Sequence, residues 1–158
     1  MQGAFGDDIQ TIGHHRTARQ VKSLVDCWDD TYTFSTIRNP WDRMVSTYHF
    51  KLKRRDKKVT NRSFEEWIID VLQNQDTTTQ CDYLAEDGKI IVDFVARFEN
   101  LNSDFKKICQ EIGANKTLLH ENKTEHERYA NYYTDTSKNV VANIFKDEVD
   151  MFGYKFGE

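Results

Sequence analysis

The spacing of apolar residues changes near residue 38, and this change predicts a strand followed by a helix. Residues 32–37 are mostly β-branched or aromatic and contain no glycine or proline, which is typical of a buried strand. Beyond them, apolar residues recur at helical spacing, at Trp41, Met44, Val45, Tyr48 and Leu52. Asn39 is a favourable N-cap and Pro40 suits the first helical position. The chain is therefore expected to pass from a strand through a tight turn into a helix, with Arg38 at the junction.

The rest of the chain alternates between helical and strand-like patterns. Further helices are expected after a Thr17 cap, from residues 61–63, after Glu99 as far as Gly113, and after a Thr134 cap. The first of these is expected to turn Leu24 inward, and Gly153 is expected to end the element after the last. Residues 89–98 form an almost continuous apolar run, which indicates a parallel strand covered on both faces. Residues 74–89 and 114–133 are polar and are expected to be loops. The alternation predicts an α/β domain built on a parallel sheet.

Composition indicates the size of the domain and the cellular compartment of the protein. The 158 residues suit a single domain, 1–158, in which residues 1–13 contain three glycines and form an irregular lead-in. The net charge of −4 argues against a nucleic-acid partner. The three cysteines lack metal-site or disulfide-framework spacing, and no apolar run resembles a signal peptide or a membrane span. We therefore predict a cytoplasmic protein with no metal site.

The strand-to-helix junction is a candidate anion site. Free backbone N–H groups and the positive end of the helix dipole favour an anion at such a point. Ser46 lies seven residues after Asn39, almost two helical turns, so it returns to the same side of the helix. The guanidinium of Arg38 and the hydroxyl of Ser46 would suit one phosphate group. An ordinary strand, turn and helix with a surface arginine fits the same spacing equally well.

A family resemblance adds to this interpretation. Residues 38–48, with the sequence RNPWDRMVSTY, resemble the 3′-phosphate-binding motif of sulfotransferases, most closely in the carbohydrate sulfotransferase branch. Further similarity lies at residues 97–101, 122–124 and 152–154. The resemblance implies a P-loop nucleotide-hydrolase-like parallel sheet flanked by helices. It also implies transfer of a sulfuryl group from 3′-phosphoadenosine 5′-phosphosulfate (PAPS) to a hydroxyl of a carbohydrate or similar acceptor, with 3′-phosphoadenosine 5′-phosphate (PAP) as the product.

The resemblance also implies roles for individual residues. The donor-binding residues that it implies are Arg38, Ser46, Lys123 and Thr124. For the catalytic base it points to His14 or His15, 24 and 23 residues before Arg38. Imidazole suits this role because its pKa lies near neutral pH. The alternative is that the two histidines are capping or surface residues.

The sequence departs from the family in one respect. The family carries a Pro-Lys-x-Gly-x-Ser/Thr loop that holds the 5′-phosphosulfate, and no such motif occurs in this chain. We therefore expect an N-terminally incomplete fold, without the strand that would lie beside residues 32–37. We expect the lead-in or a second copy in a homodimer to fill this gap, rather than direct pairing of the neighbouring strands. The functional alternative is a non-catalytic module that binds a phosphonucleotide or a sulfated glycan.

Overall fold

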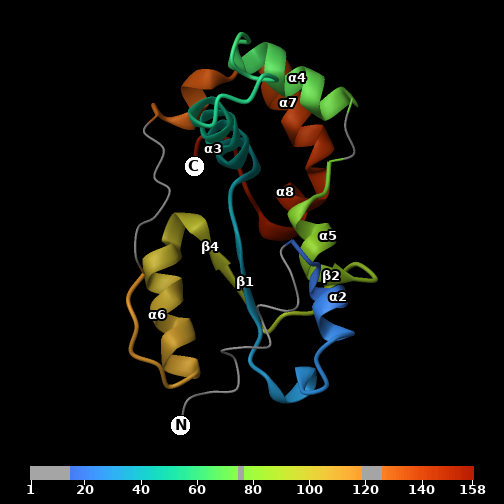
Figure 1. Cartoon of the computed structure of the whole chain (residues 1–158), viewed down its shortest axis with the longest axis vertical. Helices are drawn as coiled ribbons and strands as arrows, with labels where there is room; N and C mark the ends of the chain where they lie inside the picture. The colour runs from blue at the N-terminus through green and yellow to red at the C-terminus, as the bar shows by residue number, and fades with distance from the viewer. Residues whose placement is uncertain (1–14, 75–76, 119–125) are drawn as a thin grey trace.

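The computed structural model describes residues 15–74, 77–118 and 126–158. The helices are α2 (Ala18–Lys22), α3 (Pro40–Lys53), α4 (Phe64–Asn74), α5 (Gln80–Leu84), α6 (Leu101–Glu111), α7 (Asp135–Ile144) and α8 (Lys146–Phe152). The strands are β1 (Phe34–Ile37), β2 (Ala85–Glu86), β3 (Lys89–Ile90) and β4 (Phe94–Arg97). Short 3₁₀ turns occur at η1 (Trp28–Asp30), η2 (Phe98–Asn100) and η3 (Tyr129–Tyr132). Helices α3, α4 and α7 gather at one end of the molecule, and β1 leads away from them between α6 and α5 (Figure 1).

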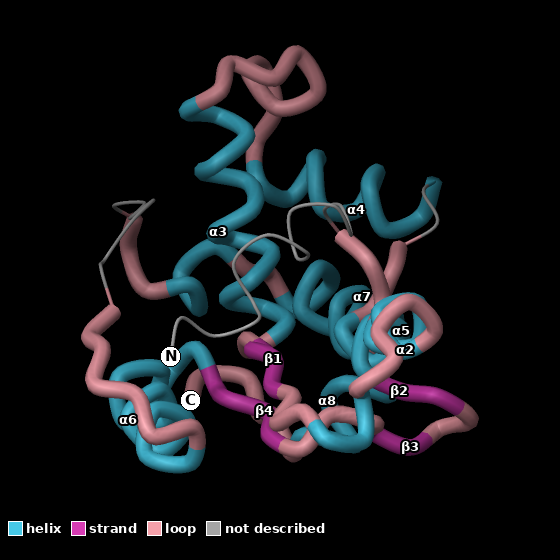
Figure 2. The backbone as a smooth tube through the Cα atoms, turned by 60° about the horizontal axis from the view of Figure 1, so that its bottom comes forward, coloured by secondary structure: helices cyan, strands magenta, loops and turns pink. Residues whose placement is uncertain are grey.

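The predicted α/β class is confirmed, although most of the ordered elements are helical. Strands β1 and β4 pair in parallel, with Phe34 opposite Phe94 and Ile37 opposite Arg97 (Figure 2). Within the described residues this parallel sheet has two strands, and β2 and β3 form a separate antiparallel pair. The flanked parallel sheet that the resemblance implies is thus present only as this pair.

The continuous strand predicted over residues 89–98 is wrong, because the chain breaks into β3 and β4. Asp87 and Gly88 both have positive φ angles, which form the turn that folds β3 back onto β2. Asp93 lies between β3 and β4, and its carboxylate accepts hydrogen bonds of 2.7 Å from the backbone N–H and the hydroxyl of Thr33. This contact anchors the start of β4 to β1.

The two edges of β1 differ. The carbonyl of Thr33 accepts from the N–H of Phe94, so the odd-numbered residues of β1 direct their backbone groups toward β4. The backbone groups of Phe34 and Thr36 therefore point to the opposite edge, where no described strand pairs with them. The sequence argument disfavoured direct pairing of two strands across the gap, and the β1–β4 pair leaves the opposite edge of β1 without a described strand. The lead-in that was expected to fill the gap lies outside the described residues.

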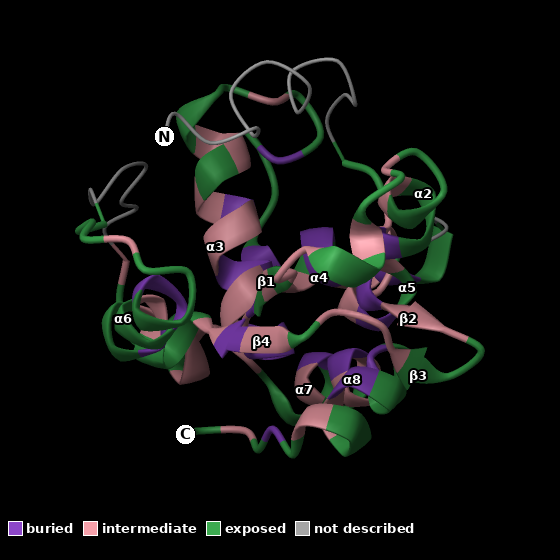
Figure 3. Cartoon of the chain, turned by 90° about the horizontal axis from the view of Figure 1, so that it is seen from below, coloured by how far each residue is buried: buried purple, intermediate pink, exposed green. Residues whose placement is uncertain are grey.

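The core forms where α3 meets α4 and α7. The predicted stripe of α3 is confirmed, because Trp41, Met44, Val45 and Tyr48 are all buried. They pack with buried residues that include Trp67 and Ile68 of α4, Val141 of α7, and Phe145. Figure 3 shows the buried positions on α3, α7 and α8. This core fixes α3 relative to the end of β1.

Two other local predictions are corrected. Residues 74–89 were expected to be a loop, but they contain α5, which begins at a capping box between Thr79 and Asp82. Leu24 was expected to face inward, but α2 ends at Lys22 and the Leu24 side chain is 53% exposed. Helix ends at glycine are confirmed: Gly113 and Gly153, which follow α6 and α8, have positive φ angles. Among the described residues, no helix is both long and apolar enough to cross a membrane.

Candidate anion-binding site

The main chain at the end of β1 is held by side chains from both sides. The N–H of Arg38 donates to Gln80 Oε1 at 2.8 Å, and Gln80 Nε2 donates to the carbonyl of Arg38 at 2.9 Å. The next N–H, that of Asn39, donates to Glu99 Oε1 at 2.6 Å. Glu99 therefore braces the junction by accepting a backbone hydrogen bond. Arg38 thus begins from a fixed backbone position.

The N-terminus of α3 is closed by its own cap. The side-chain oxygen of Asn39 accepts from the N–H groups of Trp41 at 3.1 Å and Asp42 at 3.5 Å, as the sequence predicted for an N-cap. The expectation of free N–H groups at this junction is therefore wrong. The N–H groups of Arg38, Asn39, Trp41 and Asp42 already have protein partners. Any anion at this site must be bound mainly by side chains.

The Arg38 side chain is held along the first turn of α3. Its Nε donates to Asp42 Oδ2 at 2.6 Å, and its guanidinium lies 4.1 Å from the centre of the Phe98 ring. The side chain is 19% exposed, and its two Nη groups make no hydrogen bond with the described residues. An arginine fixed through Nε and stacked on one face keeps its Nη donors in a defined direction. These donors are the part of Arg38 that can bind an anion.

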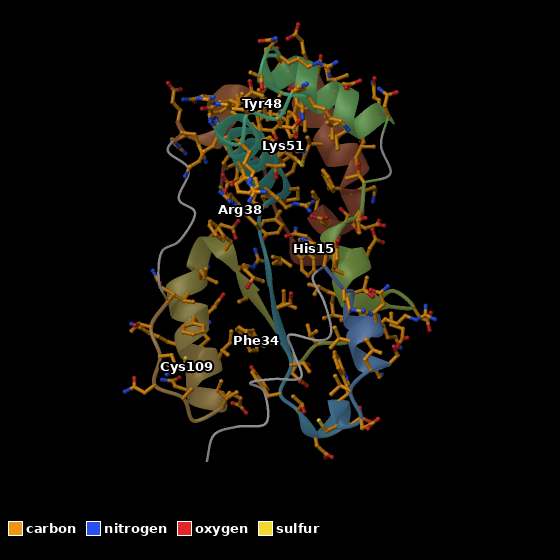
Figure 4. The ribbon with its side chains drawn as sticks, viewed as in Figure 1. His15, Phe34, Arg38, Tyr48, Lys51 and Cys109 are labelled. Carbon is orange, nitrogen blue, oxygen red and sulfur yellow. The ribbon has the colours of Figure 1, made fainter. Side chains whose placement is uncertain are left out.

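Ser46 lies one turn beyond Asp42 on the same face of α3. Residues four apart on a helix are neighbours, so Asp42 and Ser46 follow one another along this face. Ser46 is partly buried, and its hydroxyl makes no hydrogen bond with the described residues. The helix therefore directs Ser46 to the same side as the Arg38 guanidinium. Figure 4 shows Arg38 at the base of α3, next to the top of β1.

A histidine pair lies further along the same face. His49, three residues after Ser46, has its Nε2 atom 2.9 Å from the hydroxyl of Tyr132. Its ring stacks on that of His126, with centroids 5.2 Å apart and an interplanar angle of 22°. Burial lowers the pKa of His49, and the nearby His126 lowers it further. Local sequence patterns do not indicate this pairing of His49 with His126.

The stacking of His126 on His49 fixes where one loop returns to α3. Lys123 and Thr124, two of the expected donor-binding residues, lie outside the described residues.

His15 lies on the other side of β1. It lines a cavity of about 580 Å³ that follows the edge of β1 opposite β4 and is bounded by residues of α2 and α5. Neither Arg38 nor Ser46 lines this cavity, but Gln80 does, and Gln80 also holds the Arg38 main chain. Figure 4 shows His15 close to this edge of the strand. His14, the other expected base, lies outside the described residues.

A larger hollow does not fit the expected ligand. It has a volume of about 1220 Å³ and is open to solvent between α2, α5 and α8. Four aspartates line it: Asp82, Asp87, Asp147 and Asp150. Carboxylates disfavour a ligand that carries phosphate and sulfate groups. The candidate site is therefore the face of α3, not this larger hollow.

Sequence reasoning missed two residues that support the site. Gln80 was placed in a loop, and Glu148 was not considered. Glu148 is fully buried, and its carboxylate accepts from Arg43 Nη2 at 2.9 Å and from the N–H of Gln80 at 2.6 Å. A signal for α5 was present in the Thr79-x-x-Asp82 spacing, which matches a capping box. The sequence of α8 contains no comparable pattern to indicate that Glu148 is buried.

Fold and site together define a class of protein. Arg38 follows the parallel strand β1, and the capped helix α3 begins two residues later with Ser46 two turns along it. This arrangement is suited to binding an anionic ligand at a strand-to-helix junction. A model described as the Sulfotransferase family matches residues 5–155, and the chain therefore belongs to that family. This membership implies a P-loop-like fold.

Comparison with individual proteins adds one relative. An uncharacterized protein of Archaeoglobus fulgidus is 36% identical over 96 residues, which cover 58% of this chain and 75% of that protein. No solved structure matches the chain. These similarities establish the family and leave the acceptor to be inferred from the site.

Proposed function

We propose that this protein is a sulfotransferase that transfers the sulfuryl group of PAPS to a hydroxyl of a carbohydrate or similar acceptor. Membership of the sulfotransferase family supports the reaction class. The observation that carries the assignment of the donor site is the shared face of α3, where the Arg38 guanidinium and the Ser46 hydroxyl have donors without partners among the described residues. We propose no nucleic-acid partner, because the net charge of −4 does not favour a polyanion.

The donor set fits a phosphate group. The Nη groups of Arg38 provide charged donors, and Ser46 provides a hydroxyl that can donate to the same group. We assign both to the 3′-phosphate of PAPS, with Lys123 and Thr124 as further contacts. Because Asp42 holds only the Nε of Arg38, the ion pair between them orients the guanidinium without using its Nη donors.

Transfer also requires a base for the acceptor. PAPS supplies the sulfuryl group; its sulfur–oxygen bond to phosphate breaks, and a new bond forms to the acceptor oxygen. The acceptor hydroxyl must lose its proton, and we assign this step to His15 or His14. His15 borders the cavity along β1, where Thr36 and Gln80 connect it to the Arg38 junction. This cavity is the part of the described structure that we assign to the acceptor side.

Two measurements on the purified chain test this function. Calorimetric titration with PAP and with 5′-AMP, which lacks the 3′-phosphate, should show tighter binding of PAP. Incubation with PAPS and a panel of oligosaccharides and simple alcohols should release PAP and yield a sulfated product. Equal affinity for the two nucleotides would refute the donor-site assignment. Tight PAP binding with no transfer would support the alternative, a non-catalytic module that binds phosphonucleotides or sulfated glycans.

A further inference from the structure

Gln80 bonds to the Arg38 main chain as a neighbouring strand would. Its side-chain amide presents one acceptor and one donor to the N–H and carbonyl of Arg38, at 2.8 and 2.9 Å. These are the groups that Arg38 directs away from β4, on the same edge as the backbone groups of Phe34 and Thr36. Gln80 therefore extends the hydrogen bonding of β1 by one residue on the edge where no described strand pairs with it.

Glu148 fixes the orientation of this amide. Its Oε1 accepts from the backbone N–H of Gln80 and its Oε2 accepts from Gln80 Nε2, both at 2.6 Å. The carboxylate is fully buried, and its charge is balanced by Arg43 Nη2 at 2.9 and 3.2 Å from its two oxygens. Because Nε2 must face the carboxylate, Oε1 must face the N–H of Arg38. The buried pair thus determines which way the amide points.

From this geometry we propose that Gln80 is a positioning residue for the anion site, with Glu148 as the group that orients it. The proposal rests on the proposed function, because it concerns the same Arg38. Gln80 touches no ligand in this scheme. It fixes the main chain from which the guanidinium extends to Asp42 and Phe98, so that the Nη donors keep a constant position relative to Ser46. A loose main chain at Arg38 would spread these donors over several positions and weaken binding of the 3′-phosphate.

The variant Gln80→Met tests the proposal, because methionine keeps the length and volume of glutamine but cannot form the paired hydrogen bonds. We expect PAP to bind about 3- to 10-fold more weakly, the effect of losing one or two neutral hydrogen bonds. Affinity for 5′-AMP should not change, because that nucleotide does not use Arg38. The matched control is Gln73→Met at the exposed end of α4. An unchanged ratio of the PAP and 5′-AMP affinities in a folded Gln80→Met variant would overturn the proposal.

Hydrogen exchange separates this proposal from the proposed function. In Gln80→Met the amide of Arg38 should exchange at least about 10-fold faster, while the amide of Val45, buried in α3, keeps its rate. If the wild-type chain does not bind PAP, the proposed function fails. The exchange rate of the Arg38 amide still decides whether Gln80 holds the Arg38 main chain. A second variant, Gln80→Glu, places a carboxylate against Glu148 and the Arg38 carbonyl. It should accelerate exchange more than Gln80→Met does, and an unchanged rate in both variants would contradict the proposal.

Discussion

At the scale of single residues, the buried ion pair between Arg43 and Glu148 leads to a prediction about the free energy of unfolding. Burial lowers the pKa of Arg43, and the Glu148 carboxylate opposes that shift. In Arg43→Met the carboxylate of Glu148 would stay buried without a counter-charge. We expect the free energy of unfolding to fall by about 3–5 kcal/mol. Urea denaturation measures this loss.

The control for this pair lies on the surface. Arg62 pairs with Asp70 at 2.6 Å, and both side chains are more than two-fifths exposed. The variant Arg62→Met should lose no more than about 1 kcal/mol of unfolding free energy. Equal losses in the two variants would show that burial does not determine the contribution of the Glu148 pair.

The catalytic histidine is a second prediction at this scale. In a sulfotransferase that uses His15 or His14 as its base, replacement of the correct one by alanine should reduce turnover by about 10²- to 10⁴-fold. Affinity for PAP should hardly change, because His15 borders the β1 cavity and not the face of α3 that carries Ser46. Steady-state turnover and PAP calorimetry on both variants measure the two effects. Full turnover in both would place the base elsewhere.

The sequence predicted part of this site correctly. Asn39 as cap, Pro40 at the first helical position and the buried stripe of α3 follow from local propensity and periodicity, and all are confirmed. The partners of the main chain at Arg38 and Asn39 were not predictable in this way. Gln80 lies 42 residues after Arg38 and Glu99 lies 60 residues after Asn39, and only the tertiary fold brings them to the junction. For the same reason, the N–H groups expected to be free are occupied.

At the scale of elements, long periodic segments were predictable and short ones were not. Helices α3, α4, α6 and α7 have ten or more residues each, enough for their apolar periodicity to be recognised. Helix α5 has five residues and only its capping box marks it. Residues 89–98 were wrongly assigned to one strand because an apolar run does not show where a side chain such as Asp93 bonds to another strand. Short elements depend on contacts that local patterns do not contain.

Asp104 connects α6 to the end of β4 and supplies a pH-dependent prediction. Its carboxylate accepts from the N–H of Arg97 at 2.9 Å and from Lys107 Nζ at 2.8 Å, and these hydrogen bonds lower its pKa. The pKa of Asp104 is therefore lower in the folded state than in the unfolded state, where it is about 3.9. The ionised carboxylate contributes its full stabilisation of the fold above the unfolded pKa, and this contribution is lost as the pH falls through the folded pKa. Asp104→Asn should therefore lower stability at pH 7 and weaken its dependence on pH below about 5.

Urea denaturation from pH 7 to about pH 3 measures this effect. The matched control is Asp29→Asn, which changes an exposed aspartate of η1 that makes no side-chain hydrogen bond with the described residues. The control should retain both the stability at pH 7 and the acid-dependent slope of the wild type. An Asp104→Asn variant whose stability falls with acid as steeply as the wild type would contradict the assignment.

At the scale of the whole molecule, the edge of β1 opposite β4 leads to a prediction about association. The backbone groups of Phe34 and Thr36 point to an edge that no described strand covers, and the Phe34 side chain is 45% exposed. Such an edge favours pairing with another chain. The homodimer expected from the sequence therefore stays a prediction. Light scattering over a range of concentrations should show reversible dimer formation.

A lysine on this edge should prevent the association. Lysines on edge strands oppose pairing with a second strand, so Phe34→Lys should remain a monomer at concentrations where the wild type is dimeric. The control Phe50→Lys changes another exposed phenylalanine, on α3 away from the edge, and should dimerise as the wild type does. A wild-type chain that is monomeric at every concentration would rule out the homodimer.

The central claim is that the face of α3 binds the 3′-phosphate of PAPS through Arg38. The most direct test is calorimetric titration of the wild type and of Arg38→Ala with PAP and with 5′-AMP, with Arg62→Ala as a surface control. Arg38→Ala should weaken PAP binding by about 1.5–3 kcal/mol, the range for a hydrogen bond to a charged group, and Ser46→Ala should weaken it less. Binding of 5′-AMP should change little in any variant. An Arg38→Ala variant that is folded and binds PAP as tightly as the wild type would contradict the claim.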